Sequence, residues 1–258
     1  MRSIALREAI REAMSEEMRR DERVLLMGEE VAEYNGAYKV SQGMLAEFGA
    51  KRVIDTPISE LGFTAVAVGA AQNGLRPIVE FMTWNFAVLP LDQILNTASK
   101  MLAMSGGQIG CPIVMRGPNG SAGQLGAQHS TAFESYLANI PGIKVVSISN
   151  GYDAKGLLNA SINDPNPVLF FEHKFLYRSL KEEIPTDYYT VEIGKARRCS
   201  PFTMRGFRMF HGSGRCMRGS QPPFLSRKLR MRSLARALSS SRRPPPKAAS
   251  NLWVRIAV

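Results

Sequence analysis

The sequence predicts an α/β protein built on a doubly wound parallel sheet, and three observations support this. Short apolar runs recur through residues 1–190, and segments with helical periodicity separate them. Gly, Ser and acidic residues gather directly after some of the apolar runs. Apolar strands that alternate with helices are buried on both faces, as in a parallel sheet covered by two helical layers. Such domains bind ligands beyond the carboxyl ends of their strands.

The first quarter of the chain contains two predicted helices and two predicted strands. Residues 5–20 form a helix because apolar side chains recur at helical spacing, with charged residues opposite. A buried strand, 24–29, follows. Residues 41–49 are predicted to be a short helix that begins at a Ser and ends at a Gly, and residues 52–56 to be the next strand. Pro57 disfavours helix at the residue before it, which places a turn there.

The middle of the chain continues the alternation. Residues 62–71 form a helix made mostly of Gly and Ala, whose backbone can pack very close to a neighbour or a ligand. A strand is predicted over 76–82, and a helix over 90–104, which has Pro at its first turn and an apolar face. Residues 112–116 are predicted to be a strand, and a loop rich in Gly and Ser over 116–130 follows it.

Three further elements complete the predicted domain. Residues 144–148 and 167–172 are apolar and predicted to be strands, and residues 153–163 between them a helix. The predicted domain therefore covers residues 1–190.

Glu60 is the most unusual residue of the chain, because it lies between a short apolar strand and the small-residue helix. An acid there would be largely desolvated, which raises its pKa unless a hydrogen bond compensates. One interpretation is a helix-capping acid that interacts with the first-turn dipole. The other is a carboxylate that waits for a nitrogen of a ligand, and the residue pattern alone leaves both open.

Two other strand ends carry unusual residues. Residues 83–86 follow the strand 76–82, and the loop 116–130 contains His129. In a parallel sheet these segments and Glu60 would converge on one edge. A lone loop histidine is usually a surface or hydrogen-bonding residue, so the pattern by itself does not make His129 catalytic.

Composition excludes several classes of protein. A hydrophobic content of 45% is enough for a real core, and no run approaches the ~20 apolar residues of a membrane span. The N-terminus has no signal-peptide apolar centre, so we expect a cytoplasmic chain without a targeting segment. The three cysteines are far apart and form no CxxC pair, which indicates neither disulfides nor a zinc site. Neither GxxxxGKS nor a strand-linked GxGxxG occurs.

The basic charge is confined to the last part of the chain. Of the net +11, residues 198–258 contribute fourteen Lys and Arg and no Asp or Glu. The rest has nineteen basic and twenty-two acidic residues and is mildly acidic. Residues 191–258 are rich in Arg, Ser, Pro and Gly, so we expect a basic, disordered tail without a fold of its own.

Three segments resemble the beta subunit of the thiamine-diphosphate-dependent pyruvate dehydrogenases, within the transketolase-like family: TPISELGFTAVAVGAAQNGLRPIVEFMTWNF, DQILNTASKM and PIVMRGPNGSAGQLGAQHS. The resemblance covers residues 6–197. It implies that the predicted domain binds the pyrimidine of thiamine diphosphate, and that the subunit decarboxylates pyruvate and transfers acetyl to lipoamide, which leads to acetyl-CoA. YNGAYKVSQG favours pyruvate, while a branched-chain 2-oxoacid or an acetoin dehydrogenase is the alternative.

The resemblance also implies roles for individual residues. Glu60 matches the glutamate that hydrogen-bonds a ring nitrogen of the aminopyrimidine and activates the cofactor. Phe86 matches the aromatic residue that packs on the pyrimidine. His129 matches a loop histidine near the reacting carbonyl. The positions of a structural monovalent cation, potassium, are matched by Ile113, Ser161, Ile162, Asp164 and Asn166.

The same resemblance implies partners. The segment that holds the diphosphate through magnesium lies on an alpha subunit in this family, so we expect an alpha2-beta2 heterotetramer that docks on a lipoyl-bearing acyltransferase core. Relatives continue into a second α/β domain, which the basic tail replaces here. A frame-shifted or misassembled C-terminus is the favoured explanation. A noncatalytic remnant with a nucleic-acid-binding tail, or a membrane-surface segment, is the alternative.

Overall fold

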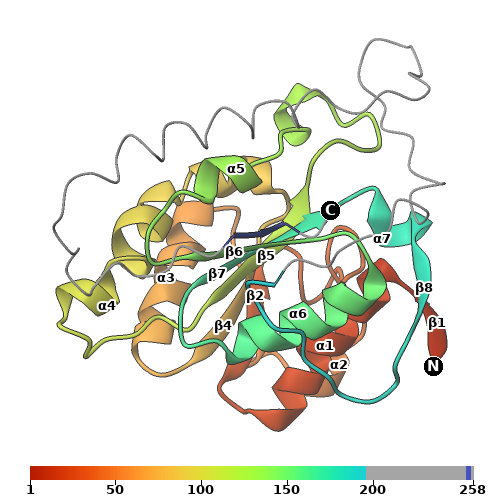
Figure 1. Cartoon of the computed structure of the whole chain (residues 1–258), viewed down its shortest axis with the longest axis horizontal. Coiled ribbons are helices and arrows are strands. Elements are labelled where there is room, and N and C mark those ends of the chain that lie inside the picture. The colour runs from red at the N-terminus through yellow and green to blue at the C-terminus, as the bar shows by residue number, and fades with distance from the viewer. Residues whose placement is uncertain (196–253, 257–258) are drawn as a thin grey trace, which may run out of the picture. The chain divides into compact units, whose positions relative to one another are not determined.

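The computed structural model describes residues 1–195 and 254–256, and its centre is a sheet with the strand order β3-β2-β4-β5-β7-β6-β9 (Figure 1). Its strands are β2 (Val24–Gly28), β3 (Val53–Asp55), β4 (Arg76–Glu80), β5 (Val114–Asn119), β6 (Lys144–Ile148), β7 (Val168–His173) and β9 (Val254–Ile256). All neighbouring strands pair in parallel. The predicted doubly wound parallel sheet is therefore confirmed.

The order of the strands places a topological switch beside β2. The chain goes from β2 to β3 on one side and then to β4 and β5 on the other. In the register of these pairs, Gly28 lies between Asp55 of β3 and Glu80 of β4. The carboxyl ends of the three strands are thus level. Open α/β sheets bind their ligands in the crevice at such a point.

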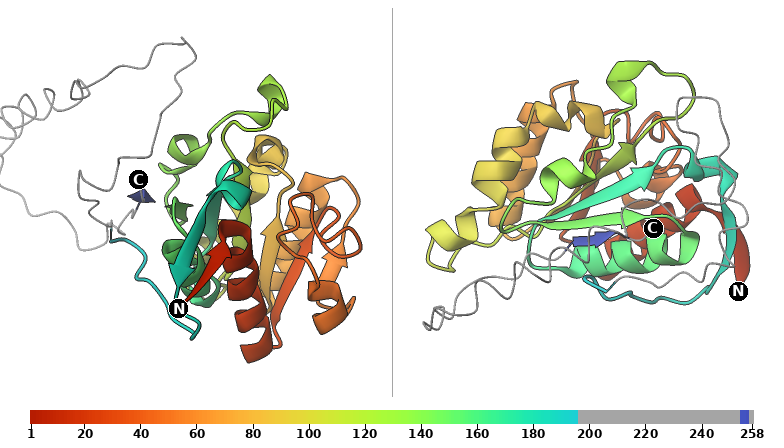
Figure 2. Two further views of the ribbon diagram at one scale, coloured as in Figure 1. Left: turned by 90° about the vertical axis from the view of Figure 1, so that its right-hand side faces the viewer. Right: turned by 45° about the horizontal axis from the view of Figure 1, so that its top comes forward.

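Helices cover both faces of the sheet, as Figures 1 and 2 show from different directions. Alternate strand residues face opposite cores: Leu26 and Ile78 belong to one, Met27 and Val79 to the other. The first core includes residues of α1 (Leu6–Arg20), α2 (Met44–Phe48), α6 (Gly151–Asn163) and α7 (Leu176–Ser179). The second includes residues of α3 (Glu60–Gln72), η1 (Trp84–Val88), η2 (Gln93–Ala98) and α5 (Glu134–Leu137).

Several predicted boundaries differ from the structure by one to three residues, and two elements differ in a way that matters for the site or the fold. The strand predicted over 112–116 extends as β5 to Asn119, and all its residues are buried. The helix predicted over 90–104 is interrupted: η2 is a π-helical turn, and the short α4 (Met101–Met104) follows. Ser99 accounts for the break, because its N–H donates to the Ile94 carbonyl five residues earlier and its hydroxyl bonds the Leu95 carbonyl.

The chain after β7 packs back against the first helical layer. β8 (Lys181–Ile184) pairs antiparallel with β1 (Arg2–Ala5), a pairing that the sequence did not indicate. Beyond β8, the Tyr188 hydroxyl donates to Glu17 of α1 at 2.9 Å, and the Val191 N–H donates to the Gly156 carbonyl of α6 at 2.9 Å. Of the predicted basic tail, only residues 191–195 and the short β9 are among the described residues.

A buried ionic network joins the three central strands. Arg116 of β5 is fully buried between Glu80 of β4 and Glu172 of β7, and it forms ion pairs with both. Its Nε donates to Glu172 Oε1 at 2.5 Å, and the Tyr177 hydroxyl donates to Glu172 Oε2 at 2.6 Å. Burial raises the pKa of Glu80. One guanidinium therefore holds two carboxylates inside the protein.

Replacement of Arg116 by Met should destabilise the domain strongly. The substitution keeps most of the side-chain volume and leaves Glu80 and Glu172 buried without their cation, which costs about 3–5 kcal/mol. Urea unfolding of the wild-type and variant chains measures the difference. Arg178→Met is the control, because Arg178 is exposed and should change the free energy of unfolding by less than ~0.5 kcal/mol. A loss below ~1 kcal/mol for Arg116→Met would show that the network is not a major support of the sheet.

Candidate functional site

Glu60 begins α3 at the carboxyl edge of the sheet, and its side chain is buried. Pro57 and Ser59 form the turn between β3 and α3, and the Ser59 carbonyl accepts the N–H of Phe63 as the helix starts. The ends of the neighbouring strands β2 and β4 are closely packed at this edge. A Cβ at Gly28 would lie only 2.5 Å from the Glu80 carbonyl oxygen, so Gly is required where β2 ends.

Glu29 faces Glu60 and was missed by the sequence analysis. It directly follows β2 and is only 5% exposed. Burial, together with the charge and hydrogen bond of Glu60, raises the pKa of Glu29 to about 7. Its Oε1 is buried and has no hydrogen-bond partner within the described residues. The sequence carried one signal for it, because Glu29 is an acid that directly follows the buried apolar strand β2.

The segment that carries Glu29 is held by specific contacts. The Asp55 carboxylate at the end of β3 accepts the N–H groups of Ala32 at 2.7 Å and Glu33 at 3.1 Å. The Ser41 hydroxyl donates to the Val31 carbonyl at 2.6 Å. These bonds fix the backbone of residues 31–33, which directly follow Glu29 and Glu30. The two acids therefore come from elements that are each anchored to the sheet edge.

Phe86 and His129 lie in contact at the same edge. Their rings are 5.3 Å apart between centroids and nearly perpendicular, at 88°. Phe86 belongs to η1 and His129 to η3 (Ala127–His129), and both side chains are half-buried. Beneath Phe86, Trp84 stacks on Phe171 of β7 with ring centroids 4.0 Å apart. The structure thus joins two of the three predicted strand-end segments directly.

The predicted cation residues gather at the opposite edge, where β5 and β7 begin. The Ile113 carbonyl accepts the Val168 N–H at 2.9 Å, and the Ile162 carbonyl accepts a bond from Arg76 at 2.8 Å. Asp164 forms an ion pair with Lys144. Asn166 donates to Asp164 Oδ1 from its backbone and its side chain, and the Ser161 carbonyl accepts the Asp164 N–H at 3.2 Å. Two cationic side chains therefore already surround these oxygens.

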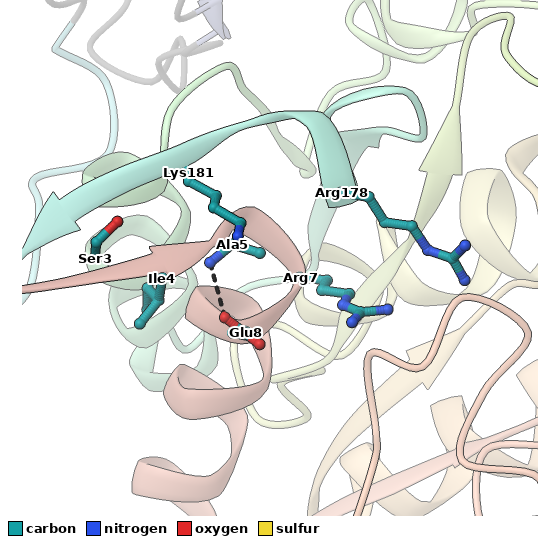
Figure 3. Close-up of a pocket in the computed structure, with 7 residues that line it drawn as sticks. All are labelled: Ser3, Ile4, Ala5, Arg7, Glu8, Arg178 and Lys181. Atoms are coloured by element: carbon teal, nitrogen blue, oxygen red, sulfur yellow. Dashed lines mark hydrogen bonds between the residues drawn. The ribbon is translucent and has the colours of Figure 1, made fainter.

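A cavity of about 320 Å³ lies elsewhere, between β1, the start of α1 and the segment from α7 to β8 (Figure 3). Its only carboxylate is that of Glu8, which accepts the Ala5 N–H at 2.8 Å. The residues that line the cavity are Ser3, Ile4, Ala5, Arg7, Glu8, Arg178 and Lys181. None of the predicted site residues is among them, so the cavity is separate from the candidate site.

Within residues 1–195 and 254–256, none of the helices has the length and hydrophobicity of a membrane-spanning segment. No group of three or more His, Cys, Asp and Glu side chains there is arranged to hold a metal ion. Cys111 is a free, buried thiol, and burial raises its pKa to about 12.

The fold and the site define a class of protein: a doubly wound α/β domain that presents two buried acids and an aromatic ring at its switch point. Sequence comparison agrees with this class. Residues 2–179 match the family described as "Transketolase, pyrimidine binding domain", and the chain belongs to this family.

The similar curated proteins are pyruvate dehydrogenase E1 component beta subunits. The chain is 58% identical over 197 residues to the one from Rhizobium meliloti (strain 1021), a match over 76% of this chain and 43% of the relative. It is 55% identical to that of Rickettsia bellii (strain RML369-C), over 75% of this chain and 59% of the relative. It is 52% identical to the mitochondrial protein of Caenorhabditis elegans, over 76% of this chain and 56% of the relative. The chain therefore spans about half the length of these relatives.

A solved structure confirms the fold. It is titled "Split gene transketolase, inactive beta4 tetramer", and it aligns with a TM-score of 0.59 over 74% of this chain and 57% of that one. The sequence identity is 16%, so this likeness supports the fold alone.

Glu29→Gln should stabilise the chain at alkaline pH. The folded-state pKa of Glu29 is raised from 4.5 to about 7, so the folded protein holds this proton more tightly than the unfolded chain does. Stability is therefore lost as the pH rises from about 4.5 through about 7. Urea unfolding at pH 5 and pH 8 should show that Gln removes a loss on the order of 2 kcal/mol. Glu30→Gln, an exposed neighbour, is the control. An equal loss in wild type and Glu29→Gln would contradict the assignment.

Proposed function

We propose that this chain supplies the pyrimidine-binding half of a thiamine-diphosphate site in a pyruvate dehydrogenase component, which decarboxylates pyruvate and passes the acetyl group to lipoamide. The observation that carries the proposal is the pair of buried acids, Glu29 and Glu60, at the switch point of this domain family. The similar proteins are pyruvate dehydrogenase subunits, which favours pyruvate over other 2-oxo acids or acetoin.

The residues at the sheet edge fit an aminopyrimidine ring. Such a ring needs a carboxyl group at a ring nitrogen and an apolar surface on one face. Glu60 is a buried acid at the edge, and the unpartnered Oε1 of Glu29 shows that polar capacity is left over there. Phe86, half-buried and outside the main core, is available to pack on the ring.

When bound, thiamine diphosphate supplies a carbanion that attacks the 2-oxo group and accepts the electrons released on decarboxylation. In this proposal the Glu60 carboxyl group is the one that hydrogen-bonds the ring nitrogen. Glu29 keeps a proton in the same region, because two adjacent buried carboxylates do not both ionise readily. His129, whose ring lies nearly perpendicular to that of Phe86, donates a proton or orients the reacting carbonyl in this proposal.

A partner subunit completes the site in this proposal. The relatives are named beta subunits, and we infer an alpha subunit that holds the diphosphate and its magnesium ion. The outer face of α3 suits such a partner, since Leu61 is 50% and Val66 63% exposed and Gly69 has open space where a Cβ would stand. Leu89, next to η1, is 56% exposed and extends the apolar surface.

Further parts of the sequence prediction stay proposals of the same kind. They include an alpha2-beta2 heterotetramer and docking on a lipoyl-bearing acyltransferase core, which the similarity to beta subunits supports. A location in the cytoplasm, or in mitochondria as the name of the nematode relative states for that protein, is likewise a prediction. The expected nucleic-acid and membrane alternatives concern the tail, of which only residues 191–195 and 254–256 are described.

We also propose the monovalent cation site. Its donors are carbonyl oxygens of Ile113, Ser161 and Ile162 together with the Asp164–Asn166 turn. Each of the three carbonyls already accepts one hydrogen bond, and a carbonyl oxygen has a second lone pair. Oxygen donors suit potassium. The cationic side chains of Arg76 and Lys144 also contact this group of oxygens, so a bound potassium ion would share them with these two residues.

Glu60→Gln should abolish most of the activity. Gln keeps the shape but replaces the carboxyl group with an amide that cannot transfer a proton, so we expect pyruvate decarboxylation to fall by at least ~100-fold. The assay mixes the chain with an alpha subunit and thiamine diphosphate and follows pyruvate turnover with an artificial electron acceptor. The matched control is Glu30→Gln, which should keep wild-type activity. Near-normal turnover by Glu60→Gln, or no turnover by a well-formed wild-type complex, would contradict the proposal.

Potassium should stabilise the chain beyond a general salt effect. A ligand that binds only the folded state raises the melting temperature, here by at least ~2 °C in potassium chloride relative to tetramethylammonium chloride at the same concentration. Differential scanning calorimetry gives the comparison. Equal melting temperatures in the two salts would remove the cation site from the account.

A further inference from the structure

Lys174 is a buried cation for which the proposed function has no role. It comes directly after β7 at the carboxyl edge of the sheet and is only 5% exposed. Burial lowers the pKa of its ammonium group. Among the described residues no carboxylate forms an ion pair with it; its Nζ donates to the backbone carbonyl of His129. Burying a charge without a counter-ion costs free energy, so the hydrogen bond from Lys174 to His129 calls for a functional explanation.

The loop that carries His129 has few other anchors. Its base is secured at Asn119, whose carbonyl accepts the Lys174 N–H at 3.2 Å and whose side chain accepts the Phe133 N–H at 3.3 Å. Residues 123–128 are exposed. The Gly120 N–H donates to the Thr131 carbonyl at 3.3 Å across the base of the loop. Nearer the tip the bonds are local: the His129 N–H donates to the Gly126 carbonyl at 3.2 Å, and the Ser130 hydroxyl to the same carbonyl at 2.7 Å.

The hydrogen bond from Lys174 therefore joins the loop to the sheet at His129, the residue with the proposed catalytic role. Lys174 donates a hydrogen bond to the backbone carbonyl of His129, and Phe86 packs against the His129 ring. The backbone and the side chain of His129 are therefore held by two different elements. The adjacent His173 also abuts the start of the loop, since a Cβ on Gly120 would lie 2.9 Å from His173 Nε2. A hydrogen bond from a charged donor is stronger than the neutral bonds elsewhere in the loop.

We propose that Lys174 is a positioning residue that fixes the His129 loop and so holds the imidazole at the reacting carbonyl. The catalytic part of this inference rests on the proposed function, whereas the ordering of the loop does not. Loss of the ammonium group should free the loop from the sheet while leaving β5 and β7 intact.

Hydrogen exchange on the full chain, without cofactor or partner, tests the ordering. In Lys174→Met, which keeps the chain length but not the charge, the peptide that contains His129 and Ser130 should exchange at least ~10-fold faster. Lys174→Arg should stay within ~3-fold of wild type, since it keeps a cationic donor. Lys181→Met, at an exposed lysine, is the control and should leave the peptide unchanged.

The kinetic readout follows in the complex with an alpha subunit. For Lys174→Met we expect kcat to fall about 10-fold with KM for pyruvate little changed, and Lys174→Arg should recover most of kcat. Unchanged exchange in Lys174→Met would overturn the proposal, and so would equal acceleration in β5 and β7, because that would mean general destabilisation. Failure of the pyruvate assay in wild type would count against the proposed function and leave the exchange result standing.

Discussion

The ion pairs of Arg116 with Glu80 and Glu172 constrain the whole carboxyl edge of the sheet. They join β4, β5 and β7 in the interior, where an unpaired charge is costly. The segments that carry Phe86 and His129 leave from β4 and β5, so their starting points are fixed by these pairs. The network also reaches the first layer, since Tyr177 bonds Glu172 and lies 5.3 Å from Tyr38 between ring centroids.

The site itself depends on a second electrostatic constraint, which is the repulsion between two buried acids. Arg116 balances the acids of the central strands, but Glu29 and Glu60 face each other, and neither forms an ion pair with a described residue. Burial and the nearby carboxylate of Glu60 raise the pKa of Glu29. In the proposed function, a ligand nitrogen that hydrogen-bonds in this space relieves the cost of burying the two acids.

Much of the fold could be predicted because it follows from periodicity. Apolar strands with intervening helices specified the parallel sheet, and Pro57 specified the turn before Glu60. The break at Ser99 could not be predicted, because it depends on a side chain that bonds back to the backbone in competition with the helix. The β1–β8 pairing joins residues far apart in sequence, and short polar strands carry little pattern.

The site was predictable only in part. Strand ends with unusual residues indicated Glu60 and the Phe86 and His129 segments, whereas their roles came from resemblance. Glu29 was overlooked because an acid after a strand is common, and only its burial beside Glu60 makes it unusual. Lys174 was overlooked because its significance depends on a carbonyl 45 residues earlier in the chain. Three-dimensional proximity, absent from the sequence, decides both cases.

The most direct measurement is a crystal structure of the chain with an alpha subunit and thiamine diphosphate. The account predicts that a Glu60 carboxyl oxygen lies about 2.6–3.0 Å from a ring nitrogen of the aminopyrimidine, with Phe86 against the ring face. A Glu60 side chain that bonds only the first-turn N–H groups of α3, with the pyrimidine more than about 4 Å away, would contradict the central claim and leave Glu60 a helix cap.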